Sequence, residues 1–414
     1  MPLRSLLVIL LSSIPFLWAA GQEEDAMPKE PTTFRTDTLS DQRDLPDLIR
    51  TLTHNTKPRD NQSKSSLALL PALGYNPSFG FLFGANIAKT SYKGDPAHTK
   101  LSVAQLDVSY TTKGLFIARF RHNIFRDHNT WNLQGNWQFN RGYMVDHGLG
   151  DTARRDPPVP YPIRYNYIKL AEKAYRRIGN DLYAGMGISL DMRNRIDDKN
   201  LDSPLLTPHY IYSRSHGFDP SGYRVNGMMF ILQYNTRDHP NSAYKGIYAD
   251  INFRFNPVWL GSTERSGQLY TEFRKYFGLS AHPGGLTLGI WYYGSYLLWG
   301  DLPYLELPGT GYDPYLRSGR GYTMGRFKGQ DYVYGETELR FSLTRDRMLG
   351  GVVFLNMQSA SERGKVALFK YMEPGYGAGL RIHFNKFSRT YVCIDYAKGR
   401  YGSDGFFFAL NESF

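Results

Sequence analysis

The sequence predicts an all-β fold, a transmembrane antiparallel β-barrel of about sixteen strands. Three observations predict it. Segments of alternating apolar and polar residues recur from residue 65 to the end, the spacing between them is alternately short and long, and no apolar run long enough for a membrane-spanning helix follows the N-terminal region. If such a chain spans a membrane, it must form a closed barrel, because that arrangement satisfies every backbone group.

The N-terminal region has the order of a secretory signal peptide. An apolar run from Leu6 to Trp18 is followed by small residues that end at Gly21, so we expect residues 1–21 to be cleaved. Residues 22–64 are polar, contain proline and show no sustained period, which predicts a flexible periplasmic segment. The barrel is then expected over residues 65–414.

The alternation assigns each strand two faces. From Ile247 to Phe255 the odd-numbered residues are apolar, and from Tyr376 to Asn385 the even-numbered residues are mostly apolar. We expect the apolar set to contact lipid and the other set to line a wet lumen. In the last segment one apolar face is expected to comprise Phe406, Phe408, Leu410 and Phe414. A large soluble all-β protein also alternates in this way and stays the alternative fold.

The spacing between strands predicts the topology, since outer-membrane barrels have short periplasmic turns and long external loops. The short connections are Arg126–Thr130, Gly179–Asp181, Thr236–Ala243 and Asn385–Arg389. The long connections are 140–164, 193–221, 299–333 and 358–375. Short and long connections alternate along the chain, as a barrel with both ends in the periplasm requires.

Composition excludes several classes of function. The single cysteine, Cys393, excludes a disulfide framework and thiolate-rich metal clusters. The net charge of +11 is scattered, with no basic block or recognition motif, so we expect no nucleic-acid partner. The histidines form no metal-binding pattern, and Ser213, Ser215 and His216 lie in a predicted loop without a nucleophile elbow. We therefore expect no enzyme, no metal and no cofactor.

A long glycine-containing loop before residue 331 carries the clearest candidate site. Such a loop can fold back into the lumen, where Arg320 would need a carboxylate partner because an unpaired buried charge is costly. Glu336 and Glu338 share one face of the following strand, so either can pair with it. Gly321 allows a close backbone approach and Tyr322 can pack on the barrel wall. The contact either only stiffens the barrel or takes part in a working cycle.

These residues resemble the sixth external loop and following strand of the BamA/TamA superfamily of outer-membrane barrels, also called bacterial surface antigens. The loop motif comprises Arg320, Gly321, Tyr322, Gly325, Arg326, Phe327 and Asp331, and its expected lumen partners are Glu336, Glu338 and Asn356. A periplasmic turn with Asn235, Arg237, Asp238 and Pro240 is similar to another family motif, as is the segment from Leu70 to Gly80. The strand with Phe406, Phe408, Leu410 and Phe414 is similar to the family's C-terminal targeting signal.

The resemblance implies an integral barrel in the outer membrane of a Gram-negative bacterium. It implies assembly or translocation of proteins through the barrel seam, where the first and last strands meet, and the lumen loop. The implied partners are outer-membrane lipid, lipopolysaccharide, unfolded outer-membrane protein clients and other assembly subunits. A passive structural or accessory barrel is the alternative, and a diffusion pore is disfavoured because the lumen loop should obstruct it.

Two features depart from the family. Asn356 and Asn235 stand where relatives usually carry aspartate, so charge should contribute less to holding the loop and the turn. The segment before the barrel, roughly forty residues, is too short for a POTRA domain, the periplasmic module that receives clients in this family.

Overall fold

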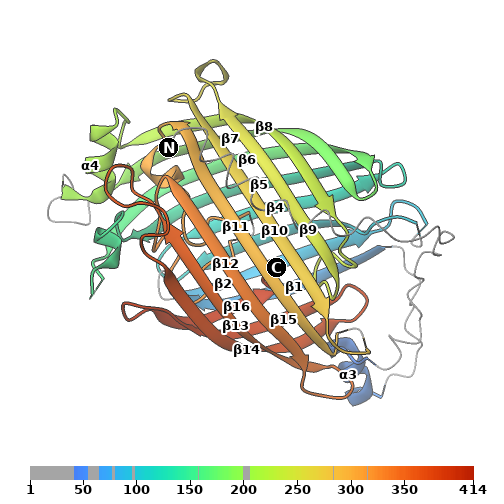
Figure 1. Ribbon diagram of the computed structural model, residues 1–414. Helices are drawn as coiled ribbons and strands as arrows, with labels where there is room; N and C mark the ends of the chain where they lie inside the picture. The colour runs from blue at the N-terminus through green and yellow to red at the C-terminus, as the bar shows by residue number, and fades with distance from the viewer. Residues whose placement is uncertain are drawn as a thin grey trace. The chain divides into compact units, whose positions relative to one another are not determined.

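The computed structural model describes residues 42–54, 65–76, 80–95, 98–156, 158–198, 206–282, 284–314 and 316–414. Sixteen strands form one sheet, and each strand pairs antiparallel with the next in sequence (Figure 1). This arrangement confirms the predicted all-β barrel fold. The strands are β1 (Ser65–Asn76), β2 (Gly80–Ser91), β3 (Ser102–Thr111), β4 (Phe116–Arg126), β5 (Trp131–Asp146), β6 (Tyr161–Gly179), β7 (Leu182–Asp197), β8 (Gly222–Asn235), β9 (Gly246–Asn256), β10 (Ser266–Gly278), β11 (Leu286–Gly300), β12 (Asp331–Ser342), β13 (Leu349–Ala360), β14 (Glu373–Asn385), β15 (Thr390–Lys398) and β16 (Asp404–Leu410).

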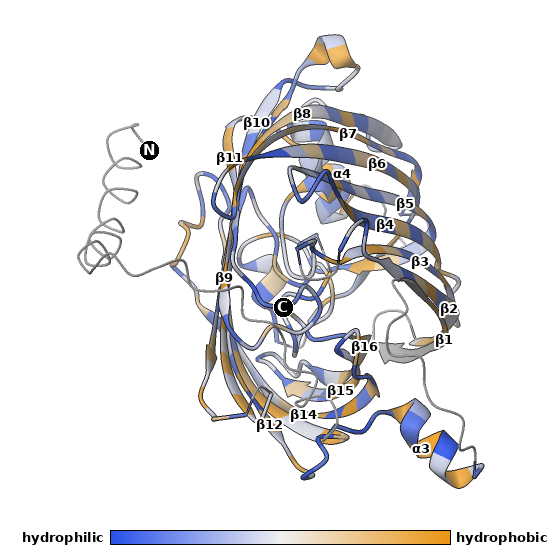
Figure 2. Cartoon of the chain, turned by 90° about the vertical axis from the view of Figure 1, so that its right-hand side faces the viewer, coloured by the Kyte–Doolittle hydropathy of each residue, from blue (hydrophilic) through white to orange (hydrophobic). Residues whose placement is uncertain are grey.

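The two faces of the sheet follow the predicted alternation (Figure 2). On β9, Ile251 is exposed on the outer face, whereas Asp250, Asn252 and Arg254 are buried on the inner face. Large apolar side chains are exposed on the outside of almost every strand. An apolar outer face on an antiparallel barrel sheet is the arrangement that is typical of outer-membrane barrels. None of the helices in the described residues is long and apolar enough to cross a membrane.

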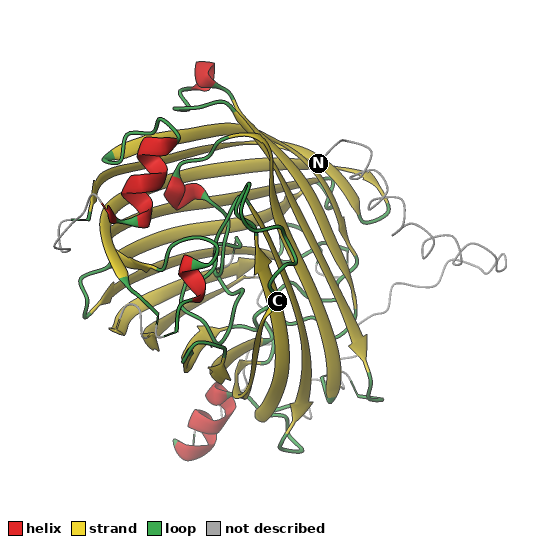
Figure 3. Cartoon of the chain, turned by 60° about the vertical axis from the view of Figure 1, so that its left-hand side comes forward, coloured by secondary structure: helices red, strands yellow, loops and turns green. Residues whose placement is uncertain are grey.

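The connections differ in length at the two ends of the strands. Strands β6 and β7 are joined by a tight turn at Asn180 and Asp181, whereas β7 and β8 are joined by a long loop that carries helix α4 (Pro208–Ser215). Figure 3 shows the helices, in red, in the segments outside the strands of the sheet. The alternation of short and long connections agrees with the predicted topology.

A short helix, α3 (Leu45–Leu52), forms in the segment that the sequence predicted to be flexible. Asp44 and Asp47 form a capping box at its start. Lys386, in the turn between β14 and β15, donates its backbone N–H to Asp44 at 3.0 Å and its Nζ to Asp47 at 2.7 Å. A helix of eight residues is not stable alone, so the capping box and the contacts with Lys386 stabilise it. The sequence pattern did not predict the helix because the contacts with Lys386 come from a distant part of the chain. The predicted signal peptide lies outside the described residues.

The last strand ends early, which corrects one expectation. Phe406 and Phe408 are 50% and 45% exposed on the outer face as expected, but Phe414 is 4% exposed. Its ring packs inside the barrel, 5.4 Å from Trp291 and 6.1 Å from Tyr276 between ring centroids.

The physical reason is that the chain leaves the sheet after Leu410. Asn411 adopts a positive φ of 70°, and Arg340 donates to the carbonyl oxygen of Phe414 at 2.7 Å. Polar contacts in the lumen therefore hold residues 411–414, and these residues do not continue strand β16. In the described residues β1 and β16 lie next to each other, but no hydrogen-bonded ladder joins them.

Candidate functional site: the lumen loop and the seam strands

The loop between β11 and β12 lies inside the barrel. Its residues Leu302, Tyr304 and Leu305 are buried in one cluster with Ile163 of β6 and Tyr212 of α4. Tyr212 donates its hydroxyl to the carbonyl oxygen of Leu302 at 3.1 Å. The loop therefore fills part of the lumen, as its glycine-containing sequence predicted.

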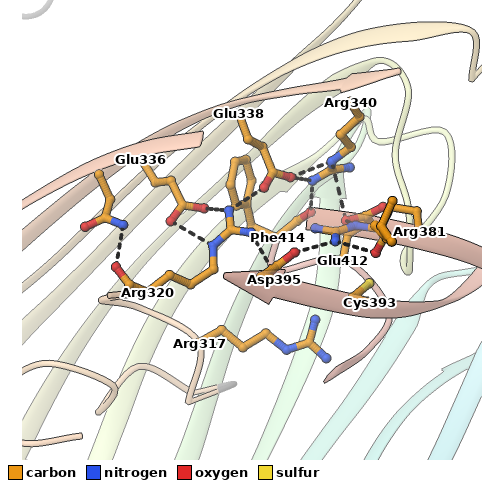
Figure 4. Close-up of polar contacts among 12 residues, drawn as sticks. Arg317, Arg320, Glu336, Glu338, Arg340, Arg381, Cys393, Asp395, Glu412 and Phe414 are labelled. Atoms are coloured by element: carbon orange, nitrogen blue, oxygen red, sulfur yellow. Dashed lines mark hydrogen bonds and ion pairs between the residues drawn. The ribbon is translucent and has the colours of Figure 1, made fainter. Parts of the chain in front are cut away.

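Arg320 of this loop sits among three carboxylates (Figure 4). Its side chain is 4% exposed and forms ion pairs with Glu336 and Glu338 of β12. Its Nη1 also donates to Asp395 of β15 at 2.9 Å, a partner that the sequence did not indicate. The guanidinium carbon lies 3.6 Å from the centroid of the Phe354 ring. Strands β12 and β15 are thus joined through one loop side chain.

The same carboxylates contact two further arginines. Arg340 of β12 pairs with Glu338, and Arg381 of β14 pairs with Asp395. Arg381 also donates from Nε to Glu412 at 2.7 Å, which attaches the chain end to the network. We call this set the carboxylate network: Arg320, Glu336, Glu338, Arg340, Arg381, Asp395 and Glu412. Four carboxylates and three guanidinium groups alternate in it, so each arginine contacts at least two acids.

The loop backbone approaches the wall closely at Gly321. Its φ is 99°, and a Cβ there would lie 2.9 Å from the carbonyl oxygen of Lys398. Next to it, the Tyr322 hydroxyl donates to the carbonyl oxygen of Pro374 and accepts from the backbone N–H of Arg400 at 2.9 Å. Asn356, where relatives have aspartate, donates Nδ2 to the carbonyl oxygen of Arg320 at 2.9 Å. A neutral hydrogen bond therefore supports the loop there.

The remaining residues of the loop motif do not belong to the carboxylate network and contact other parts of the barrel. Phe327 is buried and packs edge-on against Tyr322, with ring centroids 5.1 Å apart. Arg326 is buried beside Tyr401 and Phe327 and makes no ion pair within the described residues, and the Gly325 N–H donates to Thr310. Asp331 caps the start of β12 by accepting from the Leu297 N–H at 3.1 Å.

A second contact that holds the loop was not predicted from the sequence. Lys328 forms an ion pair with Asp146 at the end of β5, and its Nζ lies 3.6 Å from the centroid of the Tyr304 ring. Tyr304 donates its hydroxyl to the same carboxylate at 2.7 Å. The loop is therefore held on two sides of the barrel. No local pattern marks Asp146 as a partner of Lys328, because the pair forms across the lumen.

The turn motif between β8 and β9, which the sequence predicted to be periplasmic, contacts another turn. Asp238 accepts from the N–H of Tyr244 at 2.9 Å and from Arg389, between β14 and β15, at 2.7 Å. Asn235 accepts from Arg237 Nε at 3.1 Å. Pro240 precedes Asn241, whose side chain donates to the carbonyl oxygen of Ser388 at 3.0 Å. The turn between β8 and β9 thus contacts the turn between β14 and β15.

The serine–histidine group lies in the loop before β8, and no carboxylate of the described residues is hydrogen-bonded to Ser215 or His216. Ser215 Oγ lies 3.0 Å from His216 Nδ1, and the His216 ring stacks on Tyr212. Ser213 is buried. Within the described residues no group of three potential metal ligands occurs. The carboxylate network holds the lumen loop through the ion pairs of Arg320.

No protein-family model and no curated protein matches the sequence. Among solved structures, BamA from Haemophilus ducreyi lacking POTRA domains 1–3 is similar, with a TM-score of 0.53, 14% identity and coverage of 92% of this chain and 82% of that one. CdiB from Acinetobacter baumannii has a TM-score of 0.52, 12% identity and coverage of 81% and 56%. CdiB from Escherichia coli has a TM-score of 0.52, 10% identity and coverage of 84% and 60%. The chain thus spans little more than half of the CdiB chains. These similarities show that it has the BamA-type barrel fold.

Proposed function

We propose that this chain assembles or translocates proteins at the outer membrane, acting through its barrel seam and lumen loop and not by covalent chemistry. One observation carries the proposal: the described residues form no ladder between β1 and β16. An unpaired strand edge is a template on which another chain can add a strand. The fold similarity to BamA and CdiB barrels supports it.

The geometry of the last strand explains why the edge is open. β16 has 7 residues and β1 has 12, so β16 is too short to pair along the whole of β1. Pro71 lies within β1 and cannot donate a ladder hydrogen bond. Because residues 411–414 turn into the lumen, they do not extend the edge of β16.

The carboxylate network couples the loop to this edge. Glu412 and the carbonyl oxygen of Phe414 contact Arg381 and Arg340, and those arginines share carboxylates with Arg320. Movement of the last residues during strand addition would therefore disturb the contacts that hold the loop. In this cycle a client strand pairs at the seam, and the loop shifts when the end of the chain is displaced.

A passive accessory barrel is the second candidate, favoured by the same network. Buried ion pairs on both sides of the loop would stiffen a barrel that has no client. A diffusion pore fits less well because the loop occupies the lumen. The partners proposed are outer-membrane lipid, lipopolysaccharide and either unfolded client proteins or other subunits of an assembly complex.

A crosslink across the seam tests the proposal. Cysteines replace Leu69 of β1 and Phe408 of β16 in a Cys393→Ala background, and a short thiol-reactive crosslinker joins them. The matched control joins Leu69→Cys to Ile87→Cys, which pair on β1 and β2 and both lie on the outer face. The assay measures assembly of other outer-membrane proteins in cells that carry the variant as their only copy.

If the seam must open, the seam crosslink stops assembly and the control does not. Normal assembly by a barrel whose seam is almost completely crosslinked would overturn the proposal and leave the accessory barrel.

A further inference from the structure

One lumen wall carries a row of amide side chains. Gln134, Asn136, Gln138 and Asn140 occupy alternate positions of β5 and line a cavity of about 410 Å³. The lumen loop and the last residues of the chain line the same cavity. We call these four side chains the amide row.

The amide row makes no hydrogen bond to other parts of the described chain. Asn140 is 8% exposed, and the Oδ1 atoms of Asn136 and Asn140 are buried with no partner among the described residues. Some other lumen amides are paired, as where Gln233 donates to Asp250 at 3.1 Å. A buried amide without a partner is costly, so the row offers donors and acceptors to a ligand in the cavity.

Cations flank the row on both sides. Gln138 pairs across strands with Arg119 of β4 and with Lys169 of β6, and Gln134 pairs with Lys173. Lys169 has a carboxylate partner at 3.5 Å, in Asp191. Within the described residues, Arg119 and Lys173 form no ion pair. Carboxylates such as Glu272 and Glu306 line the same cavity, but arginine and lysine side chains outnumber them in its lining. The cavity therefore favours a ligand that supplies negative charge.

The spacing of the row matches an extended polypeptide. Alternate residues of a strand lie about 6.8 Å apart, and this distance is also the two-residue repeat of any extended peptide. Successive amides can then bond to every second peptide group along one edge of the bound segment. An acidic sugar chain fits less well, because Arg193 covers the Tyr165 and Tyr167 rings at 4.7 and 4.1 Å and leaves them unavailable for stacking on sugars.

We propose that the lumen wall at β4–β6 binds an extended acidic peptide segment, held by the amide row and by Arg119 and Lys173. The inference rests on the proposed function, for which it names the class of client segment. It places recognition on the lumen wall, in addition to strand pairing at the seam.

The test measures peptide binding to the full chain folded in detergent micelles. The probe is a fluorescein-labelled decapeptide of alternating Glu and Thr, and fluorescence anisotropy reports its binding. The same peptide with Lys in place of Glu and a uronic-acid hexasaccharide serve as competitors. The binding variants are Asn136→Val with Gln138→Val, and Arg119→Gln.

Matched controls separate the site from general effects. Asn132→Val changes an amide on the same strand and face that does not line the cavity, and Arg176→Gln removes an exposed charge outside it. Heat modifiability in gels verifies that each variant folds.

We expect the acidic peptide to bind, and the double amide variant to weaken it about tenfold or more. Arg119→Gln should weaken it about fivefold, and both controls should bind as the parent does. Equal affinity for the acidic and basic peptides, unchanged binding by the amide variant, or tighter binding of the hexasaccharide would each overturn the proposal. Binding should persist in the seam-crosslinked barrel, so failure of this inference and failure of the seam mechanism can be told apart.

Discussion

Replacing Arg320 by Ala should open the lumen loop. Glu338 would retain Arg340, and Asp395 would retain Arg381, but within the described residues Glu336 would keep only the Tyr334 hydroxyl. Leaving one buried charge without its partner costs about 3–5 kcal/mol. That corresponds to a factor of roughly a hundred to a few thousand in the equilibrium between closed and open loop.

The assay is heat modifiability in detergent gels, with protease sensitivity of the loop as a second readout. Arg320→Ala should lower the unfolding temperature and expose the loop. Adding Glu336→Gln should restore much of the loss, because it removes the unpaired charge. Arg326→Ala is the matched control, since this buried loop arginine makes no ion pair in the described part of the chain. If Arg320→Ala and Arg326→Ala behave alike, or if Glu336→Gln gives no rescue, the reasoning is refuted.

Three further predictions concern other parts of the barrel. In a background without the native thiol, a membrane-impermeant label should reach Arg214→Cys in intact cells but not Asn180→Cys, and labelling in the opposite sense would invert the topology. Gly321→Ala should cost about 1–3 kcal/mol because its positive φ disfavours a side chain, and heat modifiability equal to that of the parent would contradict this. Partial burial raises the pKa of Asp47, but the hydrogen bond and charge of Lys386 outweigh it and hold that pKa below its ordinary value. The contribution to docking of α3 should thus be present above an ordinary aspartate pKa of about 3.9 and be lost as the pH falls through the lowered value. Hydrogen exchange of α3 measures this loss, and Asp47→Asn should show no such acid transition.

Much of the architecture could be predicted because the strands of a barrel alternate apolar outward-facing residues with polar inward-facing residues. The period of two in residues 247–255 assigned Asp250, Asn252 and Arg254 to the lumen, and the structure places them there. Local order also placed Glu336 and Glu338 on one face, close to the loop that carries Arg320. In each case a strand's own periodicity holds the information.

Contacts across the lumen could not be predicted in this way. Asp395 completes the site of Arg320, and Asp146 that of Lys328, from strands far away in the sequence. Periodicity says that such residues face inward, but it does not say which of them meet.

The end of the chain shows the same limit most clearly. The sequence by itself determined an alternating last strand and the outer positions of Phe406 and Phe408. Tertiary structure alone decided that Phe414 lies inside, because Arg340 and Arg381 of other strands bind the last residues and draw them from the sheet. Alternation specifies the face of a residue only while that residue belongs to a strand. Charged side chains in the lumen can bind the end of a segment and take it out of the sheet.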